Sequence, residues 1–254
     1  MQEIDFYLVD AFSDRAFGGN AAAVCPLEAW LPDETLLKMA KQHNQSETAF
    51  LSERITGLNC AGLPRRMKLT SAATQPLAAS HVIFEYLDYP HTEITFTTRF
   101  VGELTVQRSG DWLTLNFPAW STGGCRYSTP SAVRALGINA ANEVRVGRDY
   151  MVVLDSQRQV EALTPDITPC SRWEKWSALQ RREMSMISSA ASCARGRGAG
   201  GSGDGSAHSM LIPYWSEKLG KTQMSARQVS LRGGDLRCEL KGDRVLIEGR
   251  PRCI

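Results

Sequence analysis

The stretch TEITFTTRFVGELTVQRSGDWLTLNF, residues 92–117, decides the fold class. It holds three runs rich in Thr, Val, Phe and Leu with short breaks between them, which predicts a meander of three strands. Periodicity and end signals predict further strands over 4–9, 48–52, 148–155 and 228–249, and helices over 32–43, 77–87, 130–137 and 208–221. Pro213 is expected near the first turn of the last helix. Many strands with few helices predict an α+β protein and not a doubly wound parallel sheet.

Composition and charge indicate the class of protein. The 254 residues are 43% hydrophobic and 22% charged, with a net charge of +2, which gives no reason to expect a nucleic-acid or membrane partner. Acidic residues in MQEIDFYLVDAF (1–12) stand where a signal peptide would be basic. Seven scattered cysteines are typical of free thiols in a reducing compartment, and the four histidines have no metal-ligand spacing. We expect a cytoplasmic globular protein without a metal or other cofactor.

The glycine-rich stretch GAGGSGDGSAHSML, residues 198–211, contains the spacing G-x-G-x-x-G of dinucleotide loops. Such a loop must follow a buried strand and open a helix, whereas SCARGRG precedes these glycines. The spacing alone therefore does not indicate a nucleotide site. A flexible linker and a damaged motif remain as alternatives.

Two windows, residues 60–76 and 170–204, follow neither the helix nor the strand period. The composition of the second permits a disordered surface insertion. A structureless stretch of that length is nevertheless unusual inside a compact domain.

The remaining segments resemble the PhzF-like family of phenazine-biosynthesis isomerases and their relatives. The resemblance rests on residues 16–52, which include NQSETAF (44–50), on LAASHVIFEYL (77–87) and on GSAHSML (205–211), and extends to 223–249. It implies a diaminopimelate epimerase-like fold of two pseudo-symmetric halves, each with a strongly bent mixed sheet around a central helix. We place these halves at 1–117 and 118–254, with 170–204 as an aberrant window of the second.

The same resemblance implies a cofactor-independent isomerase or epimerase, commonly a homodimer, that acts on a small carboxylated metabolite. It places the general acid/base on Glu47 and substrate contacts on Asn20, Ser46, Gly205 and Ser206. The residues by themselves also permit plainer roles. Glu47 could be a solvated carboxylate at a strand edge, Asn20 a turn residue and Ser206 a helix cap.

Both family motifs that end at a central helix are degenerate in this chain. Ala73 and Thr74 stand at the glycine and histidine of the family's C-G-H-A-T. Gly201 and Asp204 stand at the aspartate and threonine of its D-P-x-T-G-S-A. We expect this loss to remove a proton donor, because a hydroxyl cannot replace an imidazole.

A shifted reading frame can account for both changes. With synonymous codons chosen to match the family motif, residues 60–76 read after skipping two bases give RWFTPENEVDFCGHAT. Codons chosen in the same way for residues 170–192, shifted by two bases, and 193–205, shifted by one, give LALGKMECLAATRDVDDFVSRF and APGAGAREDPVTG. Our hypothesis is that both windows are out of frame, through a damaged gene or errors in the sequence. The alternative to an active isomerase is then a catalytically inert frame-shifted PhzF-like protein, or a binding protein.

A racemase with two opposed thiols is a third possibility in the same fold. None of the seven cysteines occupies a motif position, however, and Glu47 stands where the first thiol would be. We therefore expect the cysteines to be structural.

Overall fold

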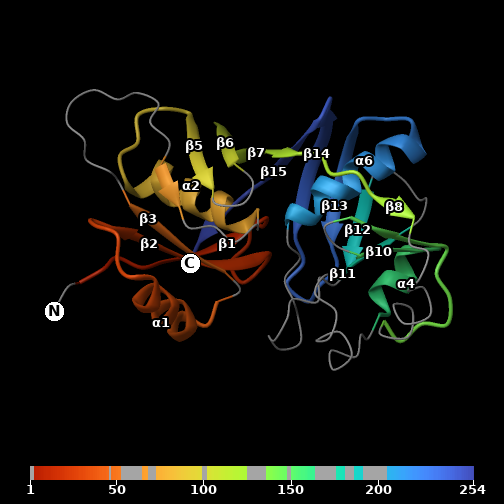
Figure 1. The fold of residues 1–254 in the computed structure, drawn as a ribbon, viewed down its shortest axis with the longest axis horizontal. Coiled ribbons are helices and arrows are strands. Elements are labelled where there is room, and N and C mark those ends of the chain that lie inside the picture. The colour runs from red at the N-terminus through yellow and green to blue at the C-terminus, as the bar shows by residue number, and fades with distance from the viewer. Residues whose placement is uncertain are drawn as a thin grey trace. The chain divides into compact units, whose positions relative to one another are not determined.

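The computed structural model of the chain describes residues 3–45, 47–52, 65–67, 73–98, 102–124, 136–147, 150–163, 176–180, 186–190 and 205–254 (Figure 1). The chain divides into two compact units, unit 1 with Met1–Phe117 and Leu246–Ile254, and unit 2 with Pro118–Val245. The halves expected from the sequence, 1–117 and 118–254, placed Leu246–Ile254 in the second half. They belong to unit 1 because the final strand pairs there with the first.

Unit 1 is a mixed sheet with two helices. Its strands lie in the order β16-β1-β2-β3-β4-β5-β6-β7. Their bounds are β1 Tyr7–Ala11, β2 Asn20–Leu27, β3 Glu47–Ser52, β4 Arg65–Met67, β5 Glu93–Thr98, β6 Gly102–Ser109, β7 Trp112–Pro118 and β16 Arg252–Cys253, and the helices are α1 Asp33–His43 and α2 Thr74–Tyr86. The meander predicted over 92–117 is confirmed as the antiparallel strands β5, β6 and β7.

Unit 2 is a second mixed sheet, with strands in the order β14-β13-β12-β11-β10-β9-β8. Its elements are β8 Gly123–Gly124, β9 Glu143–Val146, β10 Tyr150–Leu154, α4 Gln157–Glu161, β11 Trp176–Gln180, β12 Met186–Ala190, the 3-10 turn η1 Gly205–Ala207, α6 His208–Leu219, β13 Gln223–Gln228 and β14 Asp235–Lys241. The strand β15, Arg244–Gly249, starts in unit 2 and ends in unit 1.

The two units repeat one order of strand pairing. In unit 1, β1 is antiparallel to β2, β2 parallel to β3, β3 antiparallel to β4, and β4 parallel to β5. In unit 2 the same sequence of pairings runs from β9 to β13. In each unit a long helix, α2 or α6, lies in the chain before the strand that closes the second parallel pair. These mixed sheets confirm the predicted α+β class.

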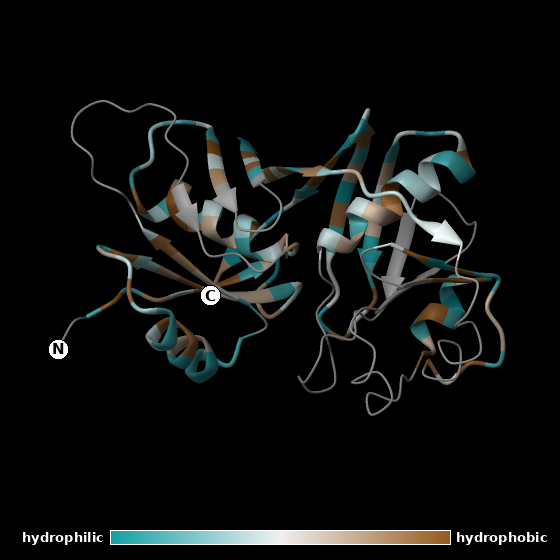
Figure 2. Ribbon diagram, in the orientation of Figure 1, coloured by the Kyte–Doolittle hydropathy of each residue, from teal (hydrophilic) through white to brown (hydrophobic). Residues whose placement is uncertain are grey.

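Helix α1 follows its sequence signals. Asp33 and Glu34 lie in its first turn and Lys41 and His43 in its last, where each charge opposes the helix dipole. Figure 2 shows hydrophilic and hydrophobic residues side by side on this helix, and Leu36 packs in a cluster with β2 and β3. The helix is therefore amphipathic and covers a sheet.

Helices α2 and α6 are buried elements of their units. Ten residues of α2 are buried, from Thr74 to Phe84, and the helix contacts β1, β2, β3 and β6. Eight residues of α6 are buried, and it contacts β14. Pro213 lies inside α6 and not near its first turn, so the position predicted for this proline is wrong. Burial of both sides of the helix holds it together past the missing N–H.

The two windows without a sequence period contain regular structure. Residues 65–67 form β4, 176–180 form β11 and 186–190 form β12, and α2 begins at Thr74, before the expected residue 77. Because strand pairing is made by backbone groups, these strands form without an alternating side-chain pattern. The interpretation of 170–204 as a disordered insertion does not hold for β11 and β12. The helix predicted over 130–137 lies largely outside the described residues.

The turn before β2 yields a stability prediction. Gly19 has φ 54°, and a Cβ there would lie 2.0 Å from the Ala11 carbonyl oxygen. We expect Gly19→Ala to lower the free energy of unfolding by about 2–4 kcal/mol, from backbone strain and from the clash. Gly110 has φ 59° but no atom within 4 Å of its Cβ position, so Gly110→Ala should cost only about 1 kcal/mol. Urea unfolding of both variants checks this, and equal costs would contradict it.

Candidate active site

Asn20 is the first residue of β2 and not a turn residue. It pairs with Ala11 across the β1–β2 ladder, directly after the Gly18-Gly19 turn. The Asp10 carboxylate accepts a hydrogen bond from the Phe17 N–H at 2.6 Å and so holds that turn. The Asn20 side chain is 2% exposed, and its Nδ2 donates to Thr74 Oγ1 at 2.6 Å. Asn20 therefore connects the start of β2 to the start of α2.

Glu47 opens β3, and the parallel register sets it opposite Ala22. Its side chain is partly exposed. The neighbouring Thr48 accepts, through its carbonyl oxygen, a hydrogen bond from Gln75 Nε2 at 3.1 Å. The first turn of α2 is thus bonded both to Asn20 and to the residue after Glu47. We call these five residues, Asn20, Glu47, Thr48, Thr74 and Gln75, the α2 corner.

The α2 corner has unused hydrogen-bond acceptors. Within the described part of the chain, Asn20 Oδ1 and Gln75 Oε1 are buried and receive no hydrogen bond. Leaving a buried polar atom unpaired costs about 1–3 kcal/mol, which a donor from a bound molecule or water would recover. The N-cap residue Ala73 also makes no side-chain cap bond, and the first turn of α2 has no acidic residue. This corner can therefore receive a polar ligand.

Thr74 and Ala73, the degenerate motif positions of unit 1, are both fully buried. The Thr74 hydroxyl is engaged with Asn20 and has no accessible protonation change near neutral pH. The corner as printed therefore keeps its glutamate and asparagine but has no imidazole at this position. Gln75 was not foreseen, because it lies in a window without a period and its partner is 27 positions away.

The second motif opens α6. Gly205 and Ser206 are buried in the turn η1, and His208, the first residue of α6, donates from Nδ1 to the Gly205 carbonyl oxygen at 3.1 Å. The N-cap residue of α6 is Ala207, whose side chain offers no cap. The first turn of α6 has no acidic side chain. Backbone amides at such a position suit an anion.

Three of the residues predicted for the site, Ser46, Gly201 and Asp204, lie outside the described residues. Of the rest, Asn20, Glu47, Ala73 and Thr74 fall together in unit 1, and Gly205 and Ser206 in unit 2.

The described His, Cys, Asp and Glu residues do not form a metal site. His208 is fully buried, and burial lowers the pKa of His81 on α2. Over the ranges that the structure describes, no three His, Cys, Asp or Glu side chains group as metal ligands would. In the same ranges no helix is long and apolar enough to cross a membrane.

The thiols can be tested directly. Burial raises the pKa of Cys25 to about 12, so at pH 8 iodoacetamide should label Cys25 about 1,000-fold more slowly than an ordinary thiol. The partly exposed Cys253 serves as the internal control in the folded protein. Peptide mass spectrometry after timed alkylation measures both rates. Rapid labelling of Cys25, with loss of activity, would instead support a thiol-dependent racemase.

The chain is similar to known proteins over nearly its whole length. The family model of phenazine biosynthesis-like proteins matches residues 9–252. The chain is 38% identical over 257 aligned residues to an uncharacterized isomerase of Pseudomonas aeruginosa, covering 98% of this chain and 95% of that protein. The crystal structure of a PhzF-family phenazine biosynthesis protein from Enterococcus faecalis aligns with TM-score 0.84 and 29% identity, over 100% of this chain and 97% of that one. A predicted epimerase from Pseudomonas aeruginosa, at 15% identity and TM-score 0.70 over 99% and 97% of the chains, shares the fold.

Proposed function

The chain belongs to the phenazine biosynthesis-like protein family, and on that premise we propose that it is a cofactor-independent isomerase or epimerase that uses Glu47 as general acid/base. The observation that carries the proposal is the α2 corner. Its hydrogen bonds bring Asn20, the start of α2 and the residue after Glu47 together. Two buried acceptors in this corner, Asn20 Oδ1 and Gln75 Oε1, receive no hydrogen bond from the described residues.

The chemistry is a proton shift on a small carboxylated substrate. Glu47 removes a proton from a carbon acidified by neighbouring groups and returns it to another atom of the substrate. A carboxylate serves both steps, since it is a base when ionised and an acid once it has taken the proton. No electrons leave the substrate, so this scheme requires no redox cofactor.

The substrate carboxylate is assigned to backbone amides at the start of α6. Gly205 and Ser206 precede this helix, and its dipole favours a negative charge at that end. The first turn of α6 carries no acidic residue that would repel such a group, which supports this assignment. Ser46 remains a proposed contact beside Glu47.

The surroundings expected from the sequence remain part of the proposal. The protein would work in the cytoplasm as a homodimer, with a small metabolite as its ligand and without nucleic-acid or membrane partners. The net charge of +2 supports the last point.

Solvent exchange tests the proposed reaction. The protein is incubated in D₂O with a panel of small carboxylates that carry an activated C–H, and deuterium uptake is followed by mass spectrometry. Uptake that depends on Glu47 is expected for members that resemble the substrate. Uptake that persists unchanged without the Glu47 carboxylate would overturn the assignment.

A second candidate function is a protein of this fold that binds small molecules without turning them over. The observation in its favour is Thr74, whose hydroxyl bonds Asn20 at the position of the family histidine. Ligand-induced stabilisation without any deuterium uptake would favour this alternative.

A further inference from the structure

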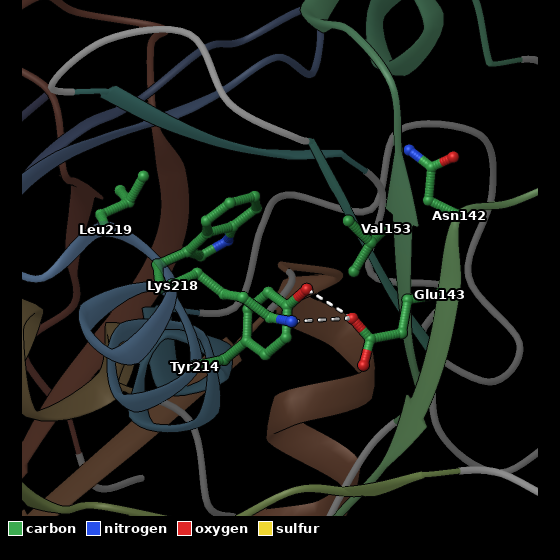
Figure 3. Close-up of a pocket in the computed structure, with 7 residues that line it drawn as sticks. Asn142, Glu143, Val153, Tyr214, Lys218 and Leu219 are labelled. Carbon is green, nitrogen blue, oxygen red and sulfur yellow. Dashed lines mark hydrogen bonds and ion pairs between the residues drawn. The ribbon is translucent and has the colours of Figure 1, made fainter.

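Unit 2 contains a cavity of about 370 Å³ beside the C-terminal half of α6 (Figure 3). We call it the α6 pocket. Its described lining comes from β9, β10 and α6, through Glu143, Val153, Tyr214, Trp215, Lys218 and Leu219, and from Asn142, which precedes β9 and donates to Asp155 Oδ1 at 2.6 Å. The amides proposed for the substrate lie at the other end of the same helix, so this pocket is separate from the proposed active site.

Glu143 is the acidic residue of the described lining, and each of its carboxylate oxygens accepts one hydrogen bond. Tyr214 Oη donates to Oε2 at 2.7 Å and Arg145 Nη1 donates to Oε1 at 2.6 Å. Figure 3 shows Tyr214 and Lys218 directed at this carboxylate. Burial acts to raise the pKa of Glu143, but the hydrogen bonds from Tyr214 and Arg145 and the nearby cations bring it below its ordinary value. Glu143 is therefore ionised at neutral pH and joins β9 to α6.

Two cations lie near Glu143, and one of them, Lys218, lines the pocket. Arg145 is committed to Glu143 and also donates to the Thr122 hydroxyl and carbonyl oxygens. Lys218 Nζ lies 3.8 Å from Glu143 Oε2, and its side chain is 51% exposed. At that distance the ion pair is weak, and no hydrogen bond from the Lys218 ammonium is seen among the described residues. Lys218 is thus the cation of the described lining that has donors to offer a ligand.

Trp215 adds a donor that lacks an acceptor. The residue is 4% exposed, and among the described residues nothing accepts a hydrogen bond from its indole Nε1–H. Its ring packs edge-on against Tyr214, with centroids 5.1 Å apart. A buried indole N–H normally finds a partner, because leaving it unpaired costs free energy. A ligand oxygen is the simplest acceptor.

We propose that the α6 pocket binds a small organic carboxylate with an apolar body. Its oxygens accept hydrogen bonds from Trp215 Nε1 and Lys218 Nζ, and its body packs on the Tyr214 ring and the Val153 and Leu219 side chains. A cationic ligand would have to compete with Arg145 and Lys218 for the Glu143 carboxylate. The pocket thus offers two donors, one of them a lysine ammonium, and aromatic and aliphatic walls.

Calorimetric titration with benzoate at neutral pH and low salt tests the proposal, with benzamide and benzylammonium as neutral and cationic analogues. Benzoate should bind best of the three. Trp215→Phe keeps the ring and removes the N–H, and Lys218→Gln removes the charge, and each should weaken benzoate binding by about tenfold. Lys38→Gln, at an exposed lysine of α1 in unit 1, is the matched control and should leave it unchanged.

Each result decides the proposal. No heat of binding at millimolar benzoate, unchanged affinity in both variants, or a preference for benzylammonium would overturn it. Lys218→Gln alters a half-exposed side chain and so remains informative if Trp215→Phe fails to fold, which thermal unfolding reveals. Because neither residue belongs to the α2 corner, failure here leaves the proposed isomerase untouched.

Discussion

Replacing Glu47 by glutamine is expected to slow deuterium uptake into substrate by about 100- to 10,000-fold, the range of general acid/base catalysis. The amide keeps the size of the side chain, and β3 keeps its backbone register opposite Ala22, so the fold should be retained. The loss is expected in kcat with little change in KM, because the carboxylate interacts with the proton during its transfer, in the transition state, and not in the bound ground state.

The control for this substitution is Glu34→Gln. Glu34 lies on the exposed side of α1, where it pairs with Lys38 at 2.7 Å with both side chains largely in solvent. Removing that surface pair should change neither the exchange rate nor, appreciably, the stability. Equal exchange in wild type and Glu47→Gln would contradict the assignment of the base. Equal losses in Glu47→Gln and Glu34→Gln would indicate a general disturbance.

Restoring the reading frame of both windows is expected to raise the exchange rate at least about 100-fold over the chain as printed, the lower range for a positioned acid or base. The restored windows carry CGHAT before α2 and EDPVTG before η1, which returns a histidine at position 74 and an aspartate to the second motif. Paired kinetics of the printed and restored chains measure the gain. The restored chain with Glu47→Gln should lose it again.

Peptide mass spectrometry of the protein from its native source decides which chain exists. Peptides with CGHAT and EDPVTG would mean that the printed windows are sequence errors and that the site is complete. Peptides with SAATQP and GGSGDG would mean a frame-shifted relative, with little or no isomerase activity expected. Similar rates in printed and restored chains would contradict the importance of the lost motifs.

Parts of the fold could be predicted from local patterns. The three strands of residues 92–117 and the amphipathic helix α1 depend on periods and end signals that operate within a dozen residues. Glu47 and Asn20 became candidates because the short segments around them resemble the family's. These signals survive because secondary structure and turns are set largely by adjacent residues.

Other features depend on contacts between distant parts of the chain. The Asn20–Thr74 bond joins residues 54 positions apart, and the Tyr214–Glu143 bond joins residues 71 positions apart. The strands β4, β11 and β12 lie in windows without any period, and Leu246–Ile254 returns to unit 1 through the pairing of β16 with β1. A local pattern cannot specify which distant backbone edge or side chain a residue will meet.

The sequence by itself determined the fold class, the helices and strands with clear periods, and the candidate glutamate. Only the tertiary structure decided that, among the described residues, Gln75 and Asn20 have buried acceptors without a donor and that α6 lines a pocket where the Trp215 indole N–H meets no acceptor. Hydrogen-bond satisfaction is a property of packed neighbours, which come together only when the sheets form.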